Sequence, residues 1–225
     1  MSKTRGNVID PLNVIDRFGT DAFRFTLVAL AAQGRDIRMS NDRVEGYRNF
    51  MNKLYQAGRF VRMHVDDATP WELPDDLPVT DRWILSRLQR VIDEVRRGIE
   101  EYRFNEAGSA FYQFVWHEFC DWYLEMIKPA LSPETGEVER QVQRAVLIRV
   151  YETILALGHP FIPFLTEELW HALPGKRGLL YDRPYPAVEY RAKVKLHGSN
   201  CAVQILDGGG IAAQSRTSLL TPEAD

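Results

Sequence analysis

The stretch NEAGSAFYQFVWHEFCDWYLEMIKPAL, residues 105–131, is apolar around most of a helical circumference and is crowded with aromatic side chains. A helix of this kind cannot leave one face in solvent and has to bury nearly all of its surface. We therefore expect it to be the central helix of the fold. This requirement limits the chain to architectures in which several other elements enclose one helix.

Three further stretches show the apolar stripe of an amphipathic helix, because apolar side chains recur every three or four residues. They span residues 44–61, 84–102 and 138–158. A shorter helix is expected after Pro163, where Thr166 or the proline itself marks the first turn. The stripe residues are Val44, Tyr47, Met51, Leu54, Ala57 and Val61 in the first stretch, and Ile84, Leu88, Val91, Val95, Ile99 and Tyr102 in the second.

Polar residues that favour helix starts precede two of these stretches. Ser40 or Asn41 can cap the first, and Thr80 or Asp81 can cap the second, because their side-chain oxygens accept hydrogen bonds from free backbone N–H groups. The intervening segment HVDDATPWELPDDLPVTD contains three prolines and six acidic residues. This composition predicts an exposed linker between the two helices.

The sequence therefore predicts a mainly α fold, with a short irregular segment followed by an antiparallel helical bundle over residues 40–173. After about residue 184 apolar and polar residues alternate, and three glycines at 208–210 predict a small β-hairpin. The expected division is an N-terminal segment, a helical domain and a hairpin tail, at residues 1–39, 40–183 and 184–225.

The charge distribution indicates a candidate binding surface. The net charge is −3, yet residues 1–62 hold 11 Lys and Arg against 6 Asp and Glu. A basic section can attract phosphates while the whole protein stays acidic. The alternative, that these cations only solvate helix faces, is equally compatible with the counts. The candidates for nucleic-acid binding are Arg43, Arg48, Lys53 and Arg59 on the first bundle helix.

Other compositional features exclude several classes of protein. No apolar run reaches the length of a membrane span, and the first residues lack the apolar core of a signal peptide. We therefore expect no membrane partner and a cytoplasmic location. Cys120 and Cys201 stand too far apart, in unlike contexts, to suggest a disulfide framework or a zinc ribbon.

His117, Cys120 and Asp121 lie at spacings i, i+3 and i+4, which could present a metal-binding face. On so aromatic a helix, a buried cysteine and a hydrogen-bonded histidine fit better, and we predict no metal. Aromatic side chains of the same helix could stack on bases, but most are expected in the core. These aromatics are Phe111, Phe114, Trp116, Phe119, Trp122 and Tyr123.

The first residues, MSKTRGN, combine a lysine with two hydroxyl side chains and a glycine. A mobile ammonium on such a loop can follow charge that develops on a triphosphate. Together with the residues through AAQGRDIR, the segment resembles the Lys-Met-Ser-Lys-Ser signature loop of class I aminoacyl-tRNA synthetases and the segment after it. The resemblance implies that Lys3 contacts ATP during amino acid activation, with Ser2 and Thr4 beside it.

Later segments resemble the valyl-tRNA synthetase branch of this class. AAQGRDIRMSNDRVEGYRNFMNKLYQAGRFV is similar to the entry of the anticodon-binding domain, and FNEAGSAFYQFVWHEFCDWYLEMIKP and HPFIPFLTEELW are similar to its later helices. These segments cover most of residues 1–173. The resemblance implies that the bundle binds the anticodon stem and loop of tRNA(Val), and that ATP and valine are substrates of the full-length family enzyme.

The chain departs from the family at its start. The first signature lysine and everything before it are missing, including the nucleotide-binding fold and the editing domain, and Thr4 replaces the final serine. Activation of an amino acid needs those parts to hold ATP and substrate in line. We therefore expect this chain alone to show no valine-dependent pyrophosphate exchange.

The C-terminal stretch KVKLHGSN resembles the Lys-x-(Asp/His)-Gly motif of covalent nucleotidyltransferases, RNA ligases above all. The resemblance implies that the amine of Lys195 attacks the α-phosphate of ATP, and that Arg216 lies on the next ligase element. It covers only residues 190–225, without the later motifs that bind metal and phosphate, so ligase activity is not expected. A gene fusion, a truncated reading frame or an assembly error would each produce such a join.

Two classes of function stay open. In the first, the chain is a fragment of valine-tRNA ligase that contributes the ATP-contacting loop and anticodon binding. In the second, it is a helical RNA-binding or interaction module without chemistry. A lysine-adenylating fusion protein is a third, separate hypothesis.

Overall fold

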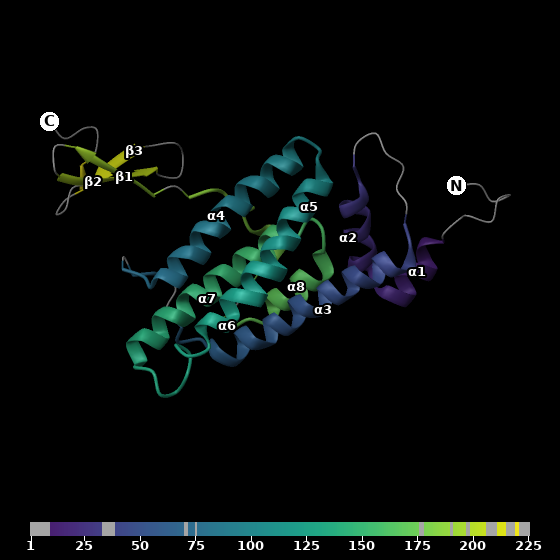
Figure 1. The fold of residues 1–225 in the computed structure, drawn as a ribbon, viewed down its shortest axis with the longest axis horizontal. Helices are drawn as coiled ribbons and strands as arrows, with labels where there is room; N and C mark the ends of the chain where they lie inside the picture. Colours follow the sequence, from purple (N-terminus) through teal and green to yellow (C-terminus); the bar gives the residue numbers. More distant parts are fainter. Residues whose placement is uncertain are drawn as a thin grey trace. The chain divides into compact units, whose positions relative to one another are not determined.

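The structure is a computed structural model of the chain. It describes residues 10–32, 39–69, 72–74, 76–175 and 178–189, and the backbone of four strands between residues 191 and 220. The chain divides into two compact units, and the boundary falls between Ala187 and Val188. The first unit holds all the described helices (Figure 1).

The first unit is helical throughout its regular elements, which confirms the mainly α prediction. Its two N-terminal helices are separated by Gly19, whose φ of 92° is a conformation that glycine adopts without strain. The elements are α1 (Pro11–Phe18), α2 (Thr20–Leu30), α3 (Asn41–His64), α4 (Val79–Glu100), α5 (Phe104–Gln113), η2 (Phe114–Tyr123), α6 (Leu124–Ile127), α7 (Glu137–Gly158), α8 (Pro163–His171) and the short 3₁₀ turn η3 (Leu180–Asp182).

The aromatic stretch forms the centre of the bundle, as predicted. Helices α5, η2 and α6 follow one another without a break, and η2 is a π-helix, a wider form that is rare in proteins. Phe111, Phe119 and Tyr123 are 0% exposed and Phe114 is 1% exposed. The neighbouring helices α3 and α4 pack against the central helix (Figure 1), and the Tyr151 ring of α7 stacks on the Phe119 ring of η2.

Successive long helices of the bundle run antiparallel, which confirms the predicted architecture. The start of α4 meets the end of η2 through Asp81 and Tyr123, whereas the end of α4 meets the start of α5. Helix α7 reverses again, because its last residue, Gly158, lies against Phe111. A Cβ atom at Gly158 would come within 2.5 Å of the Phe111 ring, so the close approach of these helices requires glycine there.

Helix α2 belongs to this packing, although it precedes the predicted bundle. The Phe25 side chain is 0% exposed and contacts Phe50 on α3, Phe111 on α5 and Phe161 in the turn between α7 and α8. Four residues earlier, the Asp21 carboxylate accepts a hydrogen bond of 2.6 Å from the backbone N–H of Leu165. Asp21 therefore caps the first turn of α8, whose own N-cap residue makes no side-chain hydrogen bond.

A charged side chain of α2 also binds the turn between α7 and α8. The Arg24 guanidinium donates hydrogen bonds to the backbone oxygens of Phe161 and Pro160 in the turn between α7 and α8. These carbonyl groups lie in the turn that follows the last residue of α7. Helix α2 is thus fixed to the α7–α8 turn by an acidic and a basic side chain that lie about one turn apart.

Two local predictions at the ends of α4 were wrong. Helix α4 begins at Val79 after Pro78, so neither Thr80 nor Asp81 occupies the cap position. Asp81 is instead a fully buried side chain inside the first turn. At the other end, Tyr102 lies beyond the helix, is 72% exposed and has a left-handed φ of 57°, so it does not continue the apolar stripe.

The second unit contains four strands, β1 (Arg191–Leu196), β2 (Ser199–Ile205), β3 (Ile211–Gln214) and β4 (Leu219–Leu220). They form an antiparallel sheet in sequential order, with Lys195 opposite Asn200 and Ile205 opposite Ile211. The glycines at 208–210, where we expected the hairpin turn, lie outside the described residues. The hairpin at that position therefore stays a prediction.

Asp81 generates a testable consequence of the fold. Its Oδ1 accepts hydrogen bonds of 2.8 Å from the Tyr123 hydroxyl and from the Gln143 amide, whereas its Oδ2 is buried without a partner. Burial raises the pKa of Asp81 above its ordinary value of 3.8, against the opposing effect of the two hydrogen bonds. The folded protein therefore binds the Asp81 proton more tightly than the unfolded chain does.

We predict that Asp81→Asn removes a pH dependence of stability. The neutral form of Asp81 stabilises the fold fully below pH 3.8, and this contribution is lost as the pH rises through the raised pKa. The free energy of unfolding of the wild type should therefore fall relative to that of Asp81→Asn as the pH is raised above 3.8. Urea titrations across this range would measure it, with exposed Asp76→Asn as the control. Parallel curves for the wild type and Asp81→Asn would contradict the prediction.

Candidate nucleic-acid interface

Helix α3 carries all four cations that the sequence indicates for nucleic-acid binding. Its buried side follows the predicted stripe, since Val44, Met51, Leu54, Ala57 and Val61 are each at most 8% exposed. The helix starts after Ser40, whose extended backbone matches an N-cap although its side chain makes no capping bond. With the apolar side fixed against the bundle, the remaining faces of α3 position the basic residues.

Arg48 and Arg59 share one exposed row on α3. They are eleven residues apart, which is close to three full turns of an α-helix, so they extend in nearly the same direction. Neither forms an ion pair within the described part of the chain, and Arg59 donates only to Gln56, at 3.2 Å. Arg62, also exposed and one turn after Arg59, continues the row. Sequence reasoning missed Arg62, although its spacing of three from Arg59 was a usable signal.

Arg43 lies apart from that row, at the start of α3. Burial raises the pKa of the Tyr47 hydroxyl, and the nearby Arg43 guanidinium opposes this shift. The guanidinium of Arg43 is therefore close to the half-buried ring of Tyr47 one turn later. Its side chain is exposed and belongs to a different part of the helix surface from Arg48.

Lys53 faces η2 instead of solvent. Its ammonium forms an ion pair with Asp121 and lies 4.3 Å from the centre of the Trp116 ring. The hydrogen bond from Lys53 lowers the pKa of Asp121, and the contact with His117 acts in the same direction. The positive charge of Lys53 is thus largely compensated within the protein, unlike the charges of Arg48 and Arg59.

Half-buried aromatic rings line the seam between α3 and the central helix, which we call the α3–η2 seam and define by Tyr47, Lys53, Tyr112, Trp116 and Asp121. The rings of Tyr112 and Trp116 stack at 5.6 Å and 23°, and Tyr47 meets Tyr112 edge-on at 6.2 Å. These rings are only partly accessible. The arrangement offers aromatic edges together with one fixed ammonium group and one carboxylate.

The six aromatics singled out in the sequence separate into core and surface groups. Four of them are buried, which confirms that most belong to the core. Trp116 is half-buried in the α3–η2 seam, and Trp122 is 64% exposed. The buried residues are Phe111, Phe114, Phe119 and Tyr123.

His117, Cys120 and Asp121 have different surroundings in the structure. The Nδ1 atom of His117 lies 3.1 Å from Asp121 Oδ2, which confirms the hydrogen-bonded histidine. Cys120 is buried, and burial raises the pKa of its thiol to about 12. Among the residues that the structure describes, no three His, Cys, Asp or Glu side chains lie together as a metal site.

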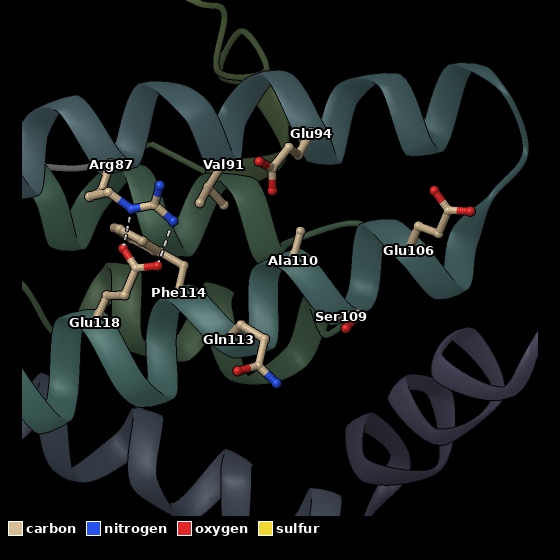
Figure 2. Close-up of a pocket in the computed structure, with 9 residues that line it drawn as sticks. All are labelled: Arg87, Val91, Glu94, Glu106, Ser109, Ala110, Gln113, Phe114 and Glu118. Carbon is tan, nitrogen blue, oxygen red and sulfur yellow. Dashed lines mark hydrogen bonds and ion pairs between the residues drawn. The ribbon is translucent and has the colours of Figure 1, made fainter.

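The surface between α4 and the central helix holds a shallow groove of about 340 Å³ (Figure 2). Arg87 and Glu118 face each other at one end and form two hydrogen bonds, of 2.6 and 2.7 Å. Glu94 and Glu106 lie toward the other end (Figure 2). Three carboxylates and one paired guanidinium make this groove unsuited to a polyanion, so the basic surface of α3 is the better nucleic-acid candidate.

The remaining predicted site residues fall outside what the structure describes at side-chain level. Ser2, Lys3 and Thr4 lie outside the described residues, as does Arg216. Lys195 is placed in β1 by its backbone, opposite Asn200. None of the helices in the described ranges combines the length and the apolar character needed to cross a membrane.

Comparison with known families decides between the possible origins of this bundle. Residues 81–207, more than half of the chain, match the family described as "Anticodon-binding domain of tRNA ligase". The chain belongs to this tRNA ligase family. Residues 1–40 match a second family, "tRNA synthetases class I (I, L, M and V)". The two matches together agree with the predicted order of a signature-loop segment followed by a helical domain.

The relatives of this tRNA ligase chain are valine–tRNA ligases. It is 54% identical over 180 residues to the enzyme of Syntrophotalea carbinolica, and 46% identical over 213 residues to that of Desulfotalea psychrophila. These alignments cover 79% and 92% of this chain, but only 20% and 24% of the relatives. These relatives agree with the valyl branch that the sequence resembles, and the chain spans between a fifth and a quarter of their length.

A solved structure shows the same fold. The ternary complex of Agrobacterium radiobacter LeuRS with tRNA and LeuAMS superimposes with a TM-score of 0.67 at 24% sequence identity. The similarity covers 84% of this chain and 22% of that one. The bundle of this tRNA ligase chain therefore has a fold that a class I synthetase also contains.

We predict that the exposed row on α3 supplies phosphate contacts. The double variant Arg48→Gln/Arg59→Gln should bind tRNA more weakly. The slope of log affinity against log salt concentration should become less steep by roughly 1.4, which is about 0.7 for each lost contact to single-stranded backbone. Filter binding at several salt concentrations would measure both quantities. The charge-matched control is Arg82→Gln/Arg90→Gln on α4, where both arginines are also exposed. Equal losses in the two double variants would disprove a specific role for the row.

Proposed function

We propose that this chain is the tRNA-contacting portion of a valine-tRNA ligase and binds the anticodon stem and loop of tRNA(Val). The observation that carries the proposal is the match of residues 81–207 to the anticodon-binding family, combined with valine–tRNA ligases as relatives. Helix α3 fits this role, because it presents an exposed basic row on one side and the α3–η2 seam on another.

The electrostatics of the chain support RNA binding despite its overall acidity. The net charge is −3, but Arg48, Arg59 and Arg62 lie exposed on one rigid helix. Counterions released from RNA phosphates by such cations supply most of the sequence-independent affinity. The groove beside α4 is lined by α4, α5 and η2, so no residue of α3 contributes to its three carboxylates. A polarised charge distribution also orients the approaching RNA.

The catalytic role is proposed for the signature segment. Lys3, with Ser2 and Thr4, would contact ATP in the activation of valine, and α1 and α2 would connect that loop to the bundle. Attachment of valine to tRNA is the activity named for relatives about four times as long as this chain. We accordingly propose three functional parts, residues 1–39, 40–183 and 184–225, and a cytoplasmic location with the rest of translation.

The deciding experiment measures tRNA binding by the purified chain. We predict that it binds tRNA(Val) at least tenfold more tightly than a tRNA(Val) transcript with an altered anticodon, at moderate salt, since lost base contacts cost about 1–3 kcal/mol each. Electrophoretic mobility shifts with both transcripts would test this. Equal affinity for the two RNAs would favour the alternative of an RNA-binding module without anticodon preference, and no binding would favour an interaction module.

A second candidate function concerns Lys195. Strand β1 ends one residue after Lys195, and β2 begins at Ser199, so the Lys-x-His-Gly motif runs from the end of a strand into a connection between two paired strands. We propose a test of lysyl-adenylate formation, in which the chain is incubated with α-labelled ATP and a divalent cation. A ligase-type nucleophile would expel pyrophosphate and leave label on the wild type through an acid-labile, alkali-stable P–N bond, with no label on Lys195→Ala. Absence of label on the wild type would remove this candidate.

A further inference from the structure

Two ion pairs join the π-helix η2 to two different neighbouring helices. Glu118 pairs with Arg87 on α4, and Asp121 pairs with Lys53 on α3. Both pairs are partly exposed, with side-chain exposures between 22% and 40%. Only the second pair involves a cation of the proposed tRNA-binding helix, which makes the first pair a natural reference for it.

The Asp121 pair restrains Lys53 from several sides. One carboxylate oxygen of Asp121 contacts the Lys53 ammonium, and the other lies 3.1 Å from His117 Nδ1. The ammonium also lies over the Trp116 ring, at 4.3 Å from its centre. An ammonium has three N–H donors, and the side chain of Lys53 keeps 27% exposure. Lys53 is therefore held in one place with donor capacity left for a ligand.

The exposed arginines of α3 have no comparable restraint. Arg48 and Arg59 lie on long side chains in solvent and can follow phosphates in many positions. A cation that adapts in this way adds affinity but little discrimination, because every nucleotide carries the same phosphate. A donor fixed beside half-buried aromatic rings can instead favour one base edge, since loop bases of RNA are read by hydrogen bonds and stacking.

We propose that Asp121 is a positioning residue for anticodon discrimination: it fixes the Lys53 ammonium in the α3–η2 seam so that the remaining donors meet the acceptor edge of one loop base. This inference rests on the proposed tRNA function and assigns a division of labour within it. The exposed row on α3 supplies affinity for any RNA backbone, and the restrained Lys53 supplies selectivity.

The test replaces Asp121 by asparagine and measures affinity and selectivity together. Asp121→Asn removes one negative charge and releases Lys53, so affinity for a tRNA with an altered anticodon should stay the same or rise. The preference for tRNA(Val) over that transcript should fall about tenfold, the loss expected when one charge-assisted hydrogen bond is misplaced. The slope of log affinity against log salt concentration should become steeper by roughly 0.7, because the freed ammonium adds a phosphate contact.

Matched variants separate positioning from general effects. Glu118→Gln removes the same charge from the same helix but breaks the pair with Arg87, so it should keep the anticodon preference. Asp121→Glu, which keeps the carboxylate, should recover part of the preference. Lys53→Met should lose as much preference for tRNA(Val) as Asp121→Asn does. Its slope of log affinity against log salt concentration should not become steeper. Circular dichroism melts would show that each variant is folded.

The possible outcomes distinguish this inference from the proposed function. If the wild-type chain shows no preference for tRNA(Val), the proposed function itself fails. If the wild type discriminates and Asp121→Asn discriminates equally well, the positioning role of Asp121 is overturned. Equal losses of preference in Asp121→Asn and Glu118→Gln would also overturn it, because they would indicate a general effect of η2.

Discussion

Burial of the central helix is the constraint on which the other features of the first unit depend. Its large aromatic side chains gain stability only when neighbouring helices exclude water from nearly the whole circumference. Helices α3, α4 and α7 satisfy this need together with α2, which contributes Phe25. The same enclosure buries some polar side chains. Asp81, Tyr123 and Gln143 are buried in this way and form hydrogen bonds with one another.

The same constraint determines what the surface can offer. A helix that packs one side against the core has to place its charged residues on the remaining faces, and the neighbours on each face decide what those charges do. On α3, Lys53 lies on the face beside η2 and pairs with Asp121. Arg48 and Arg59 lie on the opposite face and are exposed to solvent. Four residues that look equivalent in a sequence therefore occupy three distinct environments.

Most of the helical architecture could be predicted from the sequence, because long amphipathic stretches have few ways to bury their stripes. The end of α7 at Gly158 and the central position of the aromatic helix followed from local patterns, and the start of α8 at Pro163 is one of the two starts that the sequence allowed. The buried position of Asp81 did not follow from a local pattern. Whether this residue caps the helix or is a buried acceptor depends on Tyr123 and Gln143, which come from other helices.

The candidate site was only partly accessible to sequence reasoning. Periodicity placed the four cations on one helix, but the pairing of Lys53 depends on η2, whose π-helical form no sequence pattern indicated. The exposed position of Trp122 was likewise not foreseen, because an aromatic stretch does not reveal which of its residues faces outward. Contacts between elements distant in the sequence decided both cases.

The contact between Asp21 and Leu165 has a consequence for how the chain acquires its structure. The two residues are 144 positions apart, so the first turn of α8 receives its cap only after nearly the whole helical region has been synthesised and α2 has docked. Contacts of such long sequence separation form late and at a high entropic cost. The beginning and the end of the helical unit are therefore joined in one cooperative event, and a chain that began after α2 would leave the N-terminus of α8 without this cap.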